Sequence, residues 1–526
     1  MAKQTGNFAA QGGLSRRGLL INSGALGGAL IGSTLLRSGT ARAEEPVAGG
    51  HLRLGLAGGS DTDSLDPRTF YDSAPICVGY QVMNGLIEID ENNEPQPELL
   101  ESWDARNGAL HWIFNIRKGV VFHDGRSLKA DDIIYSINLH RGKDSPSAIA
   151  APMKIIADIQ KVSDYQISVT LTAPDADFLF LLGDFHLLVV PNGFTDWTKP
   201  IGTGAFVFDS FQPGVRAMMV KNKNYWKSGR GHVDSVESIM IADGMTRLNA
   251  LLNGQVDAIN RVDKKLVSML DGNNAVKIVR SDGGWHTYMA MMVDQAPYSN
   301  SDLRLALKYG IDRQQILQTI FGGFGHIGND HPIPPSDKYF NSELPQRPFD
   351  PDKAAHYWKK AGISQAVTLS ASDAPFNGAV DMAVLYQSAL KRAGIDLQVK
   401  KEPTDGFWDN VWLKAPFTTS YWGGTPTATL ILSMAYKSDA AWNDTHWKRD
   451  DFDKLLASAK AELDESKRKT YLWEIQQQLN EQGGAIIPIF SAWIDAHDVK
   501  VKGIVPHHWL DLGNLRIAEK AWLASS

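Results

Sequence analysis

Apolar and polar residues alternate in several short stretches of the first half of the chain, which is the pattern of strands with one buried face. The stretch His51–Gly59 (HLRLGLAGG) shows it first and is followed by a polar loop rich in turn-forming residues. In residues 110–122 the apolar positions alternate on both sides of Lys118-Gly119, which predicts a β-hairpin with its turn there. Further strand-like runs begin at Gln166, Gly204 and Val215.

Helical spacing of apolar residues becomes common after about residue 285. Ser301 is the predicted cap of one helix. Asp350-Pro351 begins another, which Gly362 ends, because proline suits the first helical position and glycine the residue after the last. Ser127 is the predicted N-cap of an earlier helix, since two aspartates suit the positive first turn that follows.

Residues 367–399 show the order strand, helix, strand, which indicates a βαβ unit with a parallel strand pair. No internal repeat or long linker interrupts the chain, and about 100–200 residues per domain predicts two or three domains. The fold class is therefore predicted to be α/β.

The N-terminal stretch Leu14–Glu45 places an apolar run behind Arg16-Arg17. Glycine, serine and asparagine dilute this run, whereas a spanning helix needs about 20 predominantly apolar residues. A secretory signal typically has a basic start, a weakly apolar centre and a cleavage site between small residues, and Ala41-Arg42-Ala43 fits such a site. Residues 1–43 are therefore predicted to be a signal peptide. Ser15–Leu20 (SRRGLL) also resembles the twin-arginine export signal, and an ordinary secretory signal is the alternative.

Charge and cysteine content exclude several classes of protein. Residues 1–43 hold five basic and no acidic residues, so the mature chain carries a formal charge of −11 rather than the −6 of the whole sequence. Without clustered lysine and arginine, no nucleic-acid binding is expected. Cys77 is the only cysteine, which excludes an intramolecular disulfide and a cysteine metal cluster, and it is interpreted as a packing residue.

The sequence contains no recognisable catalytic motif, since GxSxG, HExxH and Walker patterns are all absent. We therefore expect no catalytic residues, no metal and no cofactor. His507-His508 is interpreted as a surface pair, because neighbouring side chains in an extended segment point to opposite faces. Aromatic residues outside obvious core periodicity stand out instead, and glycines beside two of them suit a ligand-lined cleft. They are Tyr71, Trp285 (in GGWHTY), Tyr288, Trp408, Trp422 (in SYWGGTPT) and Trp442.

From residue 52 to about residue 505 the chain resembles the family 5 extracellular solute-binding proteins, the dipeptide and oligopeptide type that serve ABC importers. The most specific block is FNIRKGVVFHDGRSLKADDIIYSI from Phe114, in which the resemblance makes His123 and Asp124 structural residues. Other matching blocks are GGSDTDSLDPRTF, NGLIEIDENNEPQPELLESW, PIGTGAFVFDSFQPG, KNKNYW, ALLNGQVDAI, SDLRLALKYGIDRQQI and FDPDKAAHYWKKAG.

The resemblance implies a two-lobed periplasmic binding protein of type II, of the large kind with an extra domain inserted in lobe one. Lobe one would combine residues 44–82, 186–280 and 490–526, the inserted domain residues 83–185, and lobe two residues 281–489. Chain crossings near Val279 and Ile489 would form the hinge. Ligand would bind between the lobes, and closure would be what the importer senses.

The resemblance also locates the ligand site. Peptide binders of this type carry a lobe-two tryptophan and, three residues later, an aspartate that pairs with the ammonium group of the peptide. Trp422 occupies the first place, but Thr425 occupies the second, so a free peptide N-terminus is disfavoured unless Asp405 or Asp409 substitutes. An uncharged or anionic ligand that stacks on rings is favoured. The predicted ligand-binding residues are Trp422, Gly423, Thr425, Trp285, Tyr71 and Trp408.

The function that follows is a periplasmic solute-binding protein, not an enzyme. It would capture a small-molecule or peptide-like ligand as a monomer, deliver it to the permease subunits of an ABC transporter, and reach the periplasm by the twin-arginine route. A periplasmic enzyme that loads a cofactor before export is the alternative from another class, and a sensory or peptide-chaperone role on the same scaffold is a third.

Overall fold

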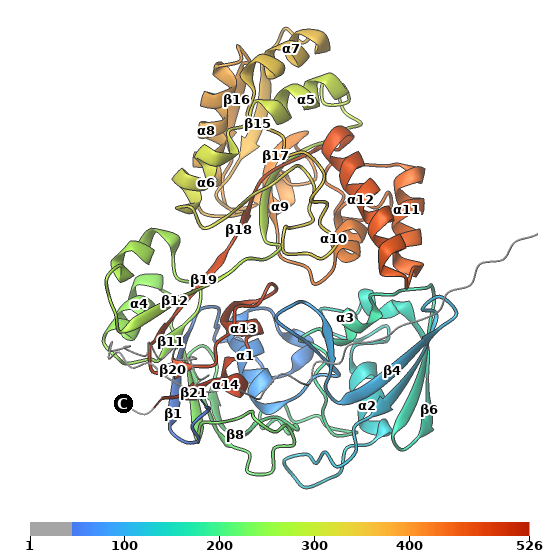
Figure 1. Cartoon of the computed structure of the whole chain (residues 1–526), viewed down its shortest axis with the longest axis vertical. Helices are drawn as coiled ribbons and strands as arrows, with labels where there is room; N and C mark the ends of the chain where they lie inside the picture. Colours follow the sequence, from blue (N-terminus) through green and yellow to red (C-terminus); the bar gives the residue numbers. More distant parts are fainter. Residues whose placement is uncertain (1–44, 525–526) are drawn as a thin grey trace, which may run out of the picture. The chain divides into compact units, whose positions relative to one another are not determined.

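The computed structural model describes residues 45–524 (Figure 1). The signal peptide predicted for residues 1–43 lies outside the described residues. None of the helices between residues 45 and 524 combines the length and the apolar character that crossing a bilayer requires. Three larger β-sheets, of seven, four and six strands, organise this part of the chain.

The seven-stranded sheet forms the centre of what we call lobe one. Its strand β1 pairs in parallel with β10 and β11, and antiparallel strands extend the sheet on both sides. Helix α1 (Ser73–Val82) contacts β8, β9 and β10, and every residue of it is buried, including Cys77 as predicted. In sheet order the strands are β12 (Val276–Ser281), β19 (Trp493–Asp498), β11 (Ala258–Ile259), β1 (His51–Leu56), β10 (Ser235–Met240), β9 (Arg216–Lys221) and β8 (Phe206–Gln212).

The four-stranded antiparallel sheet belongs to the inserted domain, which has a hydrophobic core of its own. The hairpin predicted for residues 110–122 is wrong in its second half. Strand β5 pairs with β4 and β7, and Val120 is buried without joining the ladder, because β4 just before it and the distant β7 already occupy both edges of β5. The strands in sheet order are β4 (Leu100–Arg106), β5 (His111–Ile116), β7 (Gln166–Leu171) and β6 (Ile156–Ser163).

Helix α2 of the inserted domain spans Ala130–Leu139, and its start lies two residues later than predicted. Its N-cap is Lys129, whose backbone N–H donates to the Asp132 carboxylate at 2.8 Å. Asp131 and Asp132 do lie in the first turn, where the helix dipole favours negative charge. The His123 ring lies 3.1 Å from the Gly204 carbonyl of lobe one, and Asp124 binds Arg126, so these two residues are structural, as the family resemblance implied.

The six-stranded sheet lies in lobe two and is covered on both faces. Strands β13 and β18 are buried along their whole length, because one hydrophobic cluster lies between the sheet and α5, α6 and α8, and another between the sheet and α10 to α12. The predicted βαβ unit is confirmed, since β15 and β16 flank α8 and pair in parallel. The strands in order are β14 (Gly325–Ile327), β18 (Ala485–Ser491), β13 (His286–Met291), β17 (Phe417–Trp422), β15 (Val367–Ala371) and β16 (Leu397–Lys401).

The predicted helix starts in lobe two are accurate to one residue. Asn300, not Ser301, caps α5, and its side chain accepts hydrogen bonds from the Asp302 and Leu303 amides. Asp350 caps α7 with Pro351 as the first helical residue, and Gly362 ends it with a φ of 68°, both as predicted. The helices of lobe two are α5 (Ser301–Tyr309), α6 (Arg313–Phe321), α7 (Pro351–Ala361), α8 (Ala379–Lys391), α9 (Phe407–Asn410), α10 (Ala428–Ala435), α11 (Asp450–Ala461) and α12 (Glu465–Gln482).

The remaining elements are short. Lobe one and the inserted domain also contain, within residues 45–524, three 3₁₀ helices, two small strand pairs and five helices. They are η1 (Pro67–Thr69), η2 (Pro152–Ile155), η3 (Lys264–Leu270), β2 (Ile87–Ile89) with β3 (Pro95–Pro97), β20 (Val501–Lys502) with β21 (Trp522–Leu523), α2 as above, α3 (Phe178–Leu182), α4 (Gly244–Leu252), α13 (Asp511–Asn514) and α14 (Ile517–Lys520).

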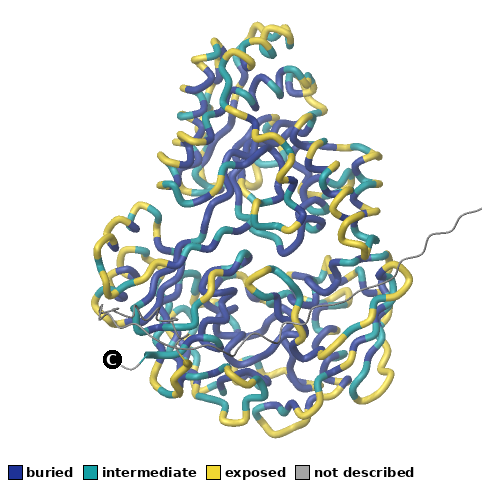
Figure 2. Tube along the Cα trace, in the orientation of Figure 1, coloured by how far each residue is buried: buried dark blue, intermediate teal, exposed yellow. Residues whose placement is uncertain are grey.

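Two chain segments connect the sheets of the two lobes. One runs from β12 to β13 through residues 282–285, and the other from β18 to β19 through Ala492 (Figure 1). Both segments lie among buried chain (Figure 2), and the Trp285 carbonyl accepts a 2.8 Å hydrogen bond from the Ser491 amide between them. The expected hinge positions Val279 and Ile489 lie a few residues earlier, inside paired strands, so the connection between the lobes is at 282–285 and 492.

Candidate functional site

The carboxyl ends of parallel strands lie beside the connecting segments in both lobes. In lobe one β11 is parallel to β1 and antiparallel to β19, so β1 and β11 end near the start of β19. In lobe two β15 and β17 are parallel, and β17 ends at Trp422 opposite His286, where β13 begins. Loops that follow such strand ends are the usual place for ligands in α/β sheets. Of the predicted ligand-binding residues, Trp422 is the last residue of β17, and Gly423 and Thr425 lie in the loop that follows it. Trp408 lies in α9 after β16, Trp285 in the first connecting segment, and Tyr71 before α1.

Four predicted or neighbouring rings form one group at the lobe-two edge. The Trp285 ring centroid lies 5.8 Å from that of Tyr421 and 6.0 Å from that of Phe376. Trp408 lies 6.0 Å from Tyr421 and is 42 % exposed. Behind it lies Trp412, whose indole N–H donates to Asp444 at 3.0 Å and so holds the ring in place.

Trp422 lies on the opposite face of the same sheet. It pairs directly with His286, whereas Trp285 precedes His286 in the chain, and side chains of consecutive strand residues point to opposite faces. Trp422 therefore belongs to the cluster under α10 to α12, with the Trp442 ring 5.9 Å away and 47 % exposed. The structure thus brings Trp285 and Trp408 together and separates Trp422 from them.

Tyr288 is a core residue, unlike the other aromatic residues that the sequence singles out. It is 1 % exposed, and its hydroxyl donates a short hydrogen bond to the buried Asp444. Burial raises the pKa of Asp444 to about 6. The pair lies behind the edge rings and supports them.

The loop after Trp422 approaches the first connecting segment closely. A Cβ on Gly284 would lie 3.3 Å from the Gly424 Cα, so these glycines let the two backbones meet. Gly423 is exposed, and a Cβ at its position would have open space around it. The Thr425 hydroxyl donates to the Thr427 carbonyl at 3.1 Å, a bond within its own loop.

The lobe-one edge presents an exposed ring next to a charged group. Tyr71 lies just before α1 and is 92 % exposed. Asp72, which caps α1, forms a 2.8 Å ion pair with Arg261, the second residue after β11. The Arg261 guanidinium also stacks on the Trp493 ring at 5.1 Å, and Trp493 is the first residue of β19.

The charge of Arg261 is neutralised by neighbouring carboxylates. Its Nε donates to Asp511 at 2.9 Å. Burial lowers the pKa of Arg261, but the charges of Asp511 and Asp72 outweigh it and hold that pKa above its ordinary value. Burial, followed by the charge of Asp511, raises the pKa of Asp495 beneath them. Sequence reasoning missed this group, because its members come from four distant segments without any motif.

The two aspartates considered as replacements for the missing ammonium partner lie beyond β16. Asp405 lines a cavity of about 460 Å³ with Lys400, Glu402 and Lys414, and Thr425 is not among the residues that line it. The Asp409 backbone carbonyl binds the Lys414 ammonium group. Their positions at this end of the sheet give no direct support to the replacement.

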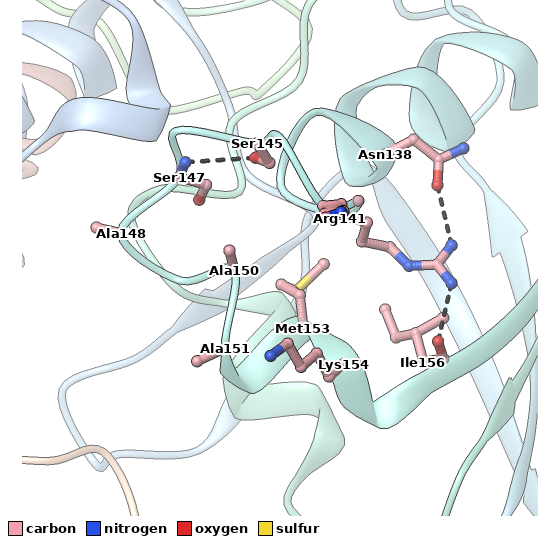
Figure 3. Close-up of a pocket in the computed structure, with 12 residues that line it drawn as sticks. Asn138, Arg141, Ser145, Ser147, Ala148, Ala150, Ala151, Met153, Lys154 and Ile156 are labelled. Carbon is pink, nitrogen blue, oxygen red and sulfur yellow. Dashed lines mark hydrogen bonds between the residues drawn. The ribbon is translucent and has the colours of Figure 1, made fainter.

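A cavity of about 990 Å³ lies on the inserted domain (Figure 3). One of its lining side chains is engaged by its neighbours, since the Arg141 guanidinium donates to Asn138 at 2.9 Å and to the Ile156 carbonyl at 2.8 Å. Lys143 and Lys154 also line it. None of the predicted ligand-binding residues is among its lining residues.

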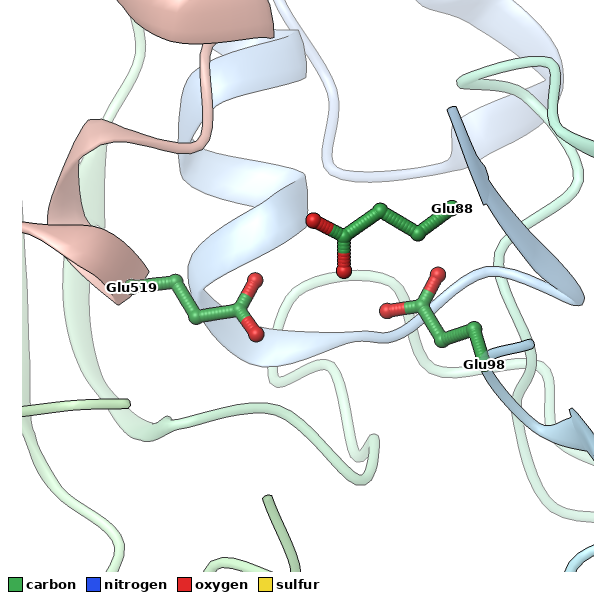
Figure 4. Close-up of side chains that lie close together, drawn as sticks. All are labelled: Glu88, Glu98 and Glu519. Carbon is green, nitrogen blue, oxygen red and sulfur yellow. The ribbon is translucent and has the colours of Figure 1, made fainter. Parts of the chain in front are cut away.

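Three glutamates converge where lobe one meets the inserted domain, and their carboxylates point toward one another (Figure 4). The Lys227 ammonium lies within 3.0 Å of all three, and Arg516 binds Glu98 through two bonds of 2.8 and 2.9 Å. Protein cations thus occupy the position a metal would take, and the cluster is structural. The three residues are Glu88, Glu98 and Glu519.

The pair His507-His508 is not a surface pair. His507 is 2 % exposed, and its Nε2 lies 3.2 Å from the Ile89 carbonyl of the inserted domain. Burial lowers its pKa to about 4. His508 lies against the first connecting segment, with its Nδ1 2.7 Å from the Asp282 carbonyl. The C-terminal segment therefore packs between the domains, which alternation within a short extended stretch cannot reveal.

The structure has two lobes joined by two connecting segments, and a further domain is inserted in the first lobe. Each lobe carries loops at its strand ends beside these segments. This architecture is that of a periplasmic binding protein of type II. The profile of the bacterial extracellular solute-binding proteins, family 5, matches residues 94–444. The chain belongs to this family.

Relatives and solved structures agree with this membership. The chain is 28 % identical over 312 residues to heme-binding protein A of Haemophilus influenzae, which covers 54 % of this chain and 56 % of that protein. It is 25 % identical over 480 residues to di/tripeptide-binding protein 1 of Pseudomonas aeruginosa, covering 81 % and 86 %. The structure of HbpA2 from Haemophilus parasuis superimposes with a TM-score of 0.82 at 20 % identity, covering 90 % of this chain and 100 % of that one.

The peptide complex of DppA from Helicobacter pylori superimposes with a TM-score of 0.73 at 22 % identity, covering 91 % of this chain and 99 % of that one. The predicted α/β fold of two lobes is confirmed. The chain is a periplasmic solute-binding protein that serves an ABC importer and is not an enzyme.

Proposed function

We propose that the chain captures its solute between the strand-end loops of its two lobes. The observation that carries this proposal is the set of exposed or half-buried rings beside the connecting segments, with Tyr71 on one lobe and Trp285 and Trp408 on the other. Rotation about residues 282–285 and 492 would bring these rings onto a ligand from both sides. Lobe one would comprise residues 44–82, 186–281 and 493–526, the inserted domain 83–185, and lobe two 286–491, since β12 ends at residue 281 and β18 at residue 491.

The chemistry of both edges supports an uncharged ligand that stacks on rings. Thr425 supplies no countercharge for an ammonium group, and an unpaired buried charge costs several kcal/mol. Arg261 is already paired with Asp72 and Asp511, so it offers no free positive charge to an anion. Relatives named for di- and tripeptides, glutathione and heme show that the family accepts varied solutes. We infer a neutral, partly aromatic solute rather than a free peptide, which the monomeric protein passes to the permease.

Substitution of a predicted ring tests the site. Trp285→Ala is expected to weaken ligand binding about tenfold or more, because a stacked aromatic ring contributes on the order of 1–2 kcal/mol. The retained solute is identified by native mass spectrometry of protein purified from the periplasm and then titrated by calorimetry. Trp358→Ala, on α7 in the same lobe, is the control and should leave the affinity unchanged.

An unchanged affinity for Trp422→Ala together with a large loss for Trp285→Ala would confine the site to the face that carries Trp285 and Trp408. Unchanged affinity in both variants would refute the proposed site. A co-purified dipeptide would refute the inference drawn from Thr425.

We propose further that export uses the twin-arginine route, which carries folded proteins. Changing Arg16→Lys together with Arg17→Lys is expected to leave precursor in the cytoplasm, because that route requires the arginine pair and not merely positive charge. Immunoblots of periplasmic and cytoplasmic fractions measure the outcome. Normal processing and a periplasmic location of the double variant would show that the ordinary secretory route is used.

A further inference from the structure

The inserted domain contacts lobe two through a buried charged pair, at the side of the molecule opposite the connecting segments. Asp177 immediately precedes α3, which lies beside the lower ends of α11 and α12 in Figure 1. Its carboxylate accepts short hydrogen bonds from the Thr429 hydroxyl of α10 and from the Arg468 guanidinium of α12. Asp177, Thr429 and Arg468 are each less than 10 % exposed. This contact lies between parts of the chain that the two connecting segments also join.

A second pair lies directly beside the first. The Lys460 ammonium at the end of α11 lies 2.9 Å from the Asp175 carboxylate. The Ala176 amide, between the two aspartates, donates to the Lys460 carbonyl at 2.7 Å. One short stretch of the inserted domain, residues 175–177, therefore contacts three different helices of lobe two.

The same interface reaches the loop that carries the proposed ligand residues. The Asn93 amide group donates to the Pro426 carbonyl at 2.8 Å, and Thr427 caps α10, which carries Thr429 in its first turn. Pro426 directly follows Thr425. The loop from Trp422 to Thr425 is thus held at its C-terminal end by contacts from the inserted domain.

We propose that Asp177 is a positioning residue for solute capture: with Asp175, it holds lobe two closed against the inserted domain and thereby fixes the Trp422–Thr425 loop. The proposal rests on the proposed function of that loop. A rotation about the connecting segments moves lobe two relative to the inserted domain, so it must break these pairs. The pairs stabilise the closed arrangement, and the apparent affinity for solute scales with the population of that arrangement.

The direct test measures the distance between the inserted domain and lobe two without any ligand. Spin labels are placed on Ala157→Cys in β6 and Lys359→Cys in α7, both exposed. Cys77 is fully buried, and burial raises its pKa to about 12, so it does not react with the label. Pulsed electron–electron double resonance then gives the distance distribution of the mature protein.

We expect the parent protein to show a major short-distance population. Asp177→Asn is expected to reduce the ratio of short to long distances at least tenfold, and Lys460→Met, at a more exposed position, at least threefold. The matched control is Asp439→Asn, which removes an exposed ion pair with Lys437 inside lobe two and should leave the distribution unchanged. Lys460→Met keeps the test valid if Asp177→Asn does not fold.

Exchange of the charges supplies a rescue experiment. The double variant Asp175→Lys with Lys460→Asp restores the attraction with opposite polarity and is expected to recover most of the short-distance population, whereas Asp175→Lys alone does not. A structural role limited to stability would not give this pattern. Distributions that are identical in the parent, Asp177→Asn and Lys460→Met, or a parent without a short-distance population, would overturn the proposal. Neither result depends on the ligand, so both are distinct from failure of the ring substitutions.

Discussion

Replacing Arg516 by methionine is expected to lower the free energy of unfolding by about 3–5 kcal/mol, the usual cost of breaking a buried ion pair by removing one partner. Arg516 is 2 % exposed and binds both oxygens of Glu98, which is fully buried. It also lies 3.3 Å from the Glu519 carboxylate and stacks on the Tyr80 ring at 4.2 Å. Methionine keeps the apolar contact with Tyr80 and removes only the charge and its hydrogen bonds.

The electrostatics of the cluster explain the size of this effect. Burial raises the pKa of Glu88, but the charges of Arg516 and Lys227 outweigh it and hold that pKa below its ordinary value. Without Arg516, one oxygen of Glu98 loses its only cationic partner among the described residues, in a place that water does not reach.

Denaturant unfolding followed by circular dichroism measures the change. Arg216→Met is the matched control, because its 3.3 Å pair with Glu237 is exposed at the arginine and should cost less than about 1 kcal/mol. Equal unfolding midpoints for the Arg516 and Arg216 variants would contradict the structural role assigned to the cluster.

Replacing His331 by leucine is expected to make the protein more resistant to acid, by about 3 kcal/mol at pH 4. His331 is fully buried in lobe two, neither ring nitrogen has a hydrogen-bond partner within residues 45–524, and burial lowers its pKa to about 4. In the unfolded chain a histidine has a pKa of about 6.5. The unfolded state therefore binds a proton before the folded state does, and stability is lost as the pH falls from about 6.5 toward 4.

The measurement is the free energy of unfolding of both proteins between pH 4 and 8. Above pH 7 the two curves should run parallel, because the ring is then neutral in both states. Below about pH 6.5 the parent should lose stability relative to the variant, with a difference in slope of about 1.4 kcal/mol per pH unit. Parallel curves throughout would mean that His331 gains a proton in the folded state as easily as in the unfolded one.

Local sequence signals predicted the elements whose partners are close in the chain. The caps of α7, the βαβ unit of β15, α8 and β16, and the first strand depend on residues within a turn or on a short crossover, so their chemistry is visible in the sequence. The hairpin at residues 110–122 failed because β5 takes its partners from β4 and β7. Alternation shows that a strand has a buried face, but not which strands lie beside it.

The candidate site shows the same limit. Adjacent glycines predicted strand-end positions for Trp285 and Trp422, but strand register placed Trp422 on the other face of the sheet from Trp285. The glycines beside them serve the approach of two backbones to each other. Asp72, Arg261 and Asp511 gather only because β1, β11 and the C-terminal segment meet at one edge of lobe one.

The sequence by itself determined the class of this protein, its expected export, and the family whose long ordered blocks it carries, because these depend on composition and on residues near one another in the chain. The tertiary structure decided which charges are buried and paired, which face each ring occupies, and that Asp177 meets Arg468 across 291 positions of sequence. The physical reason is that burial and pairing arise only when distant segments exclude water together. The residues that hold the domains against each other are of this second kind.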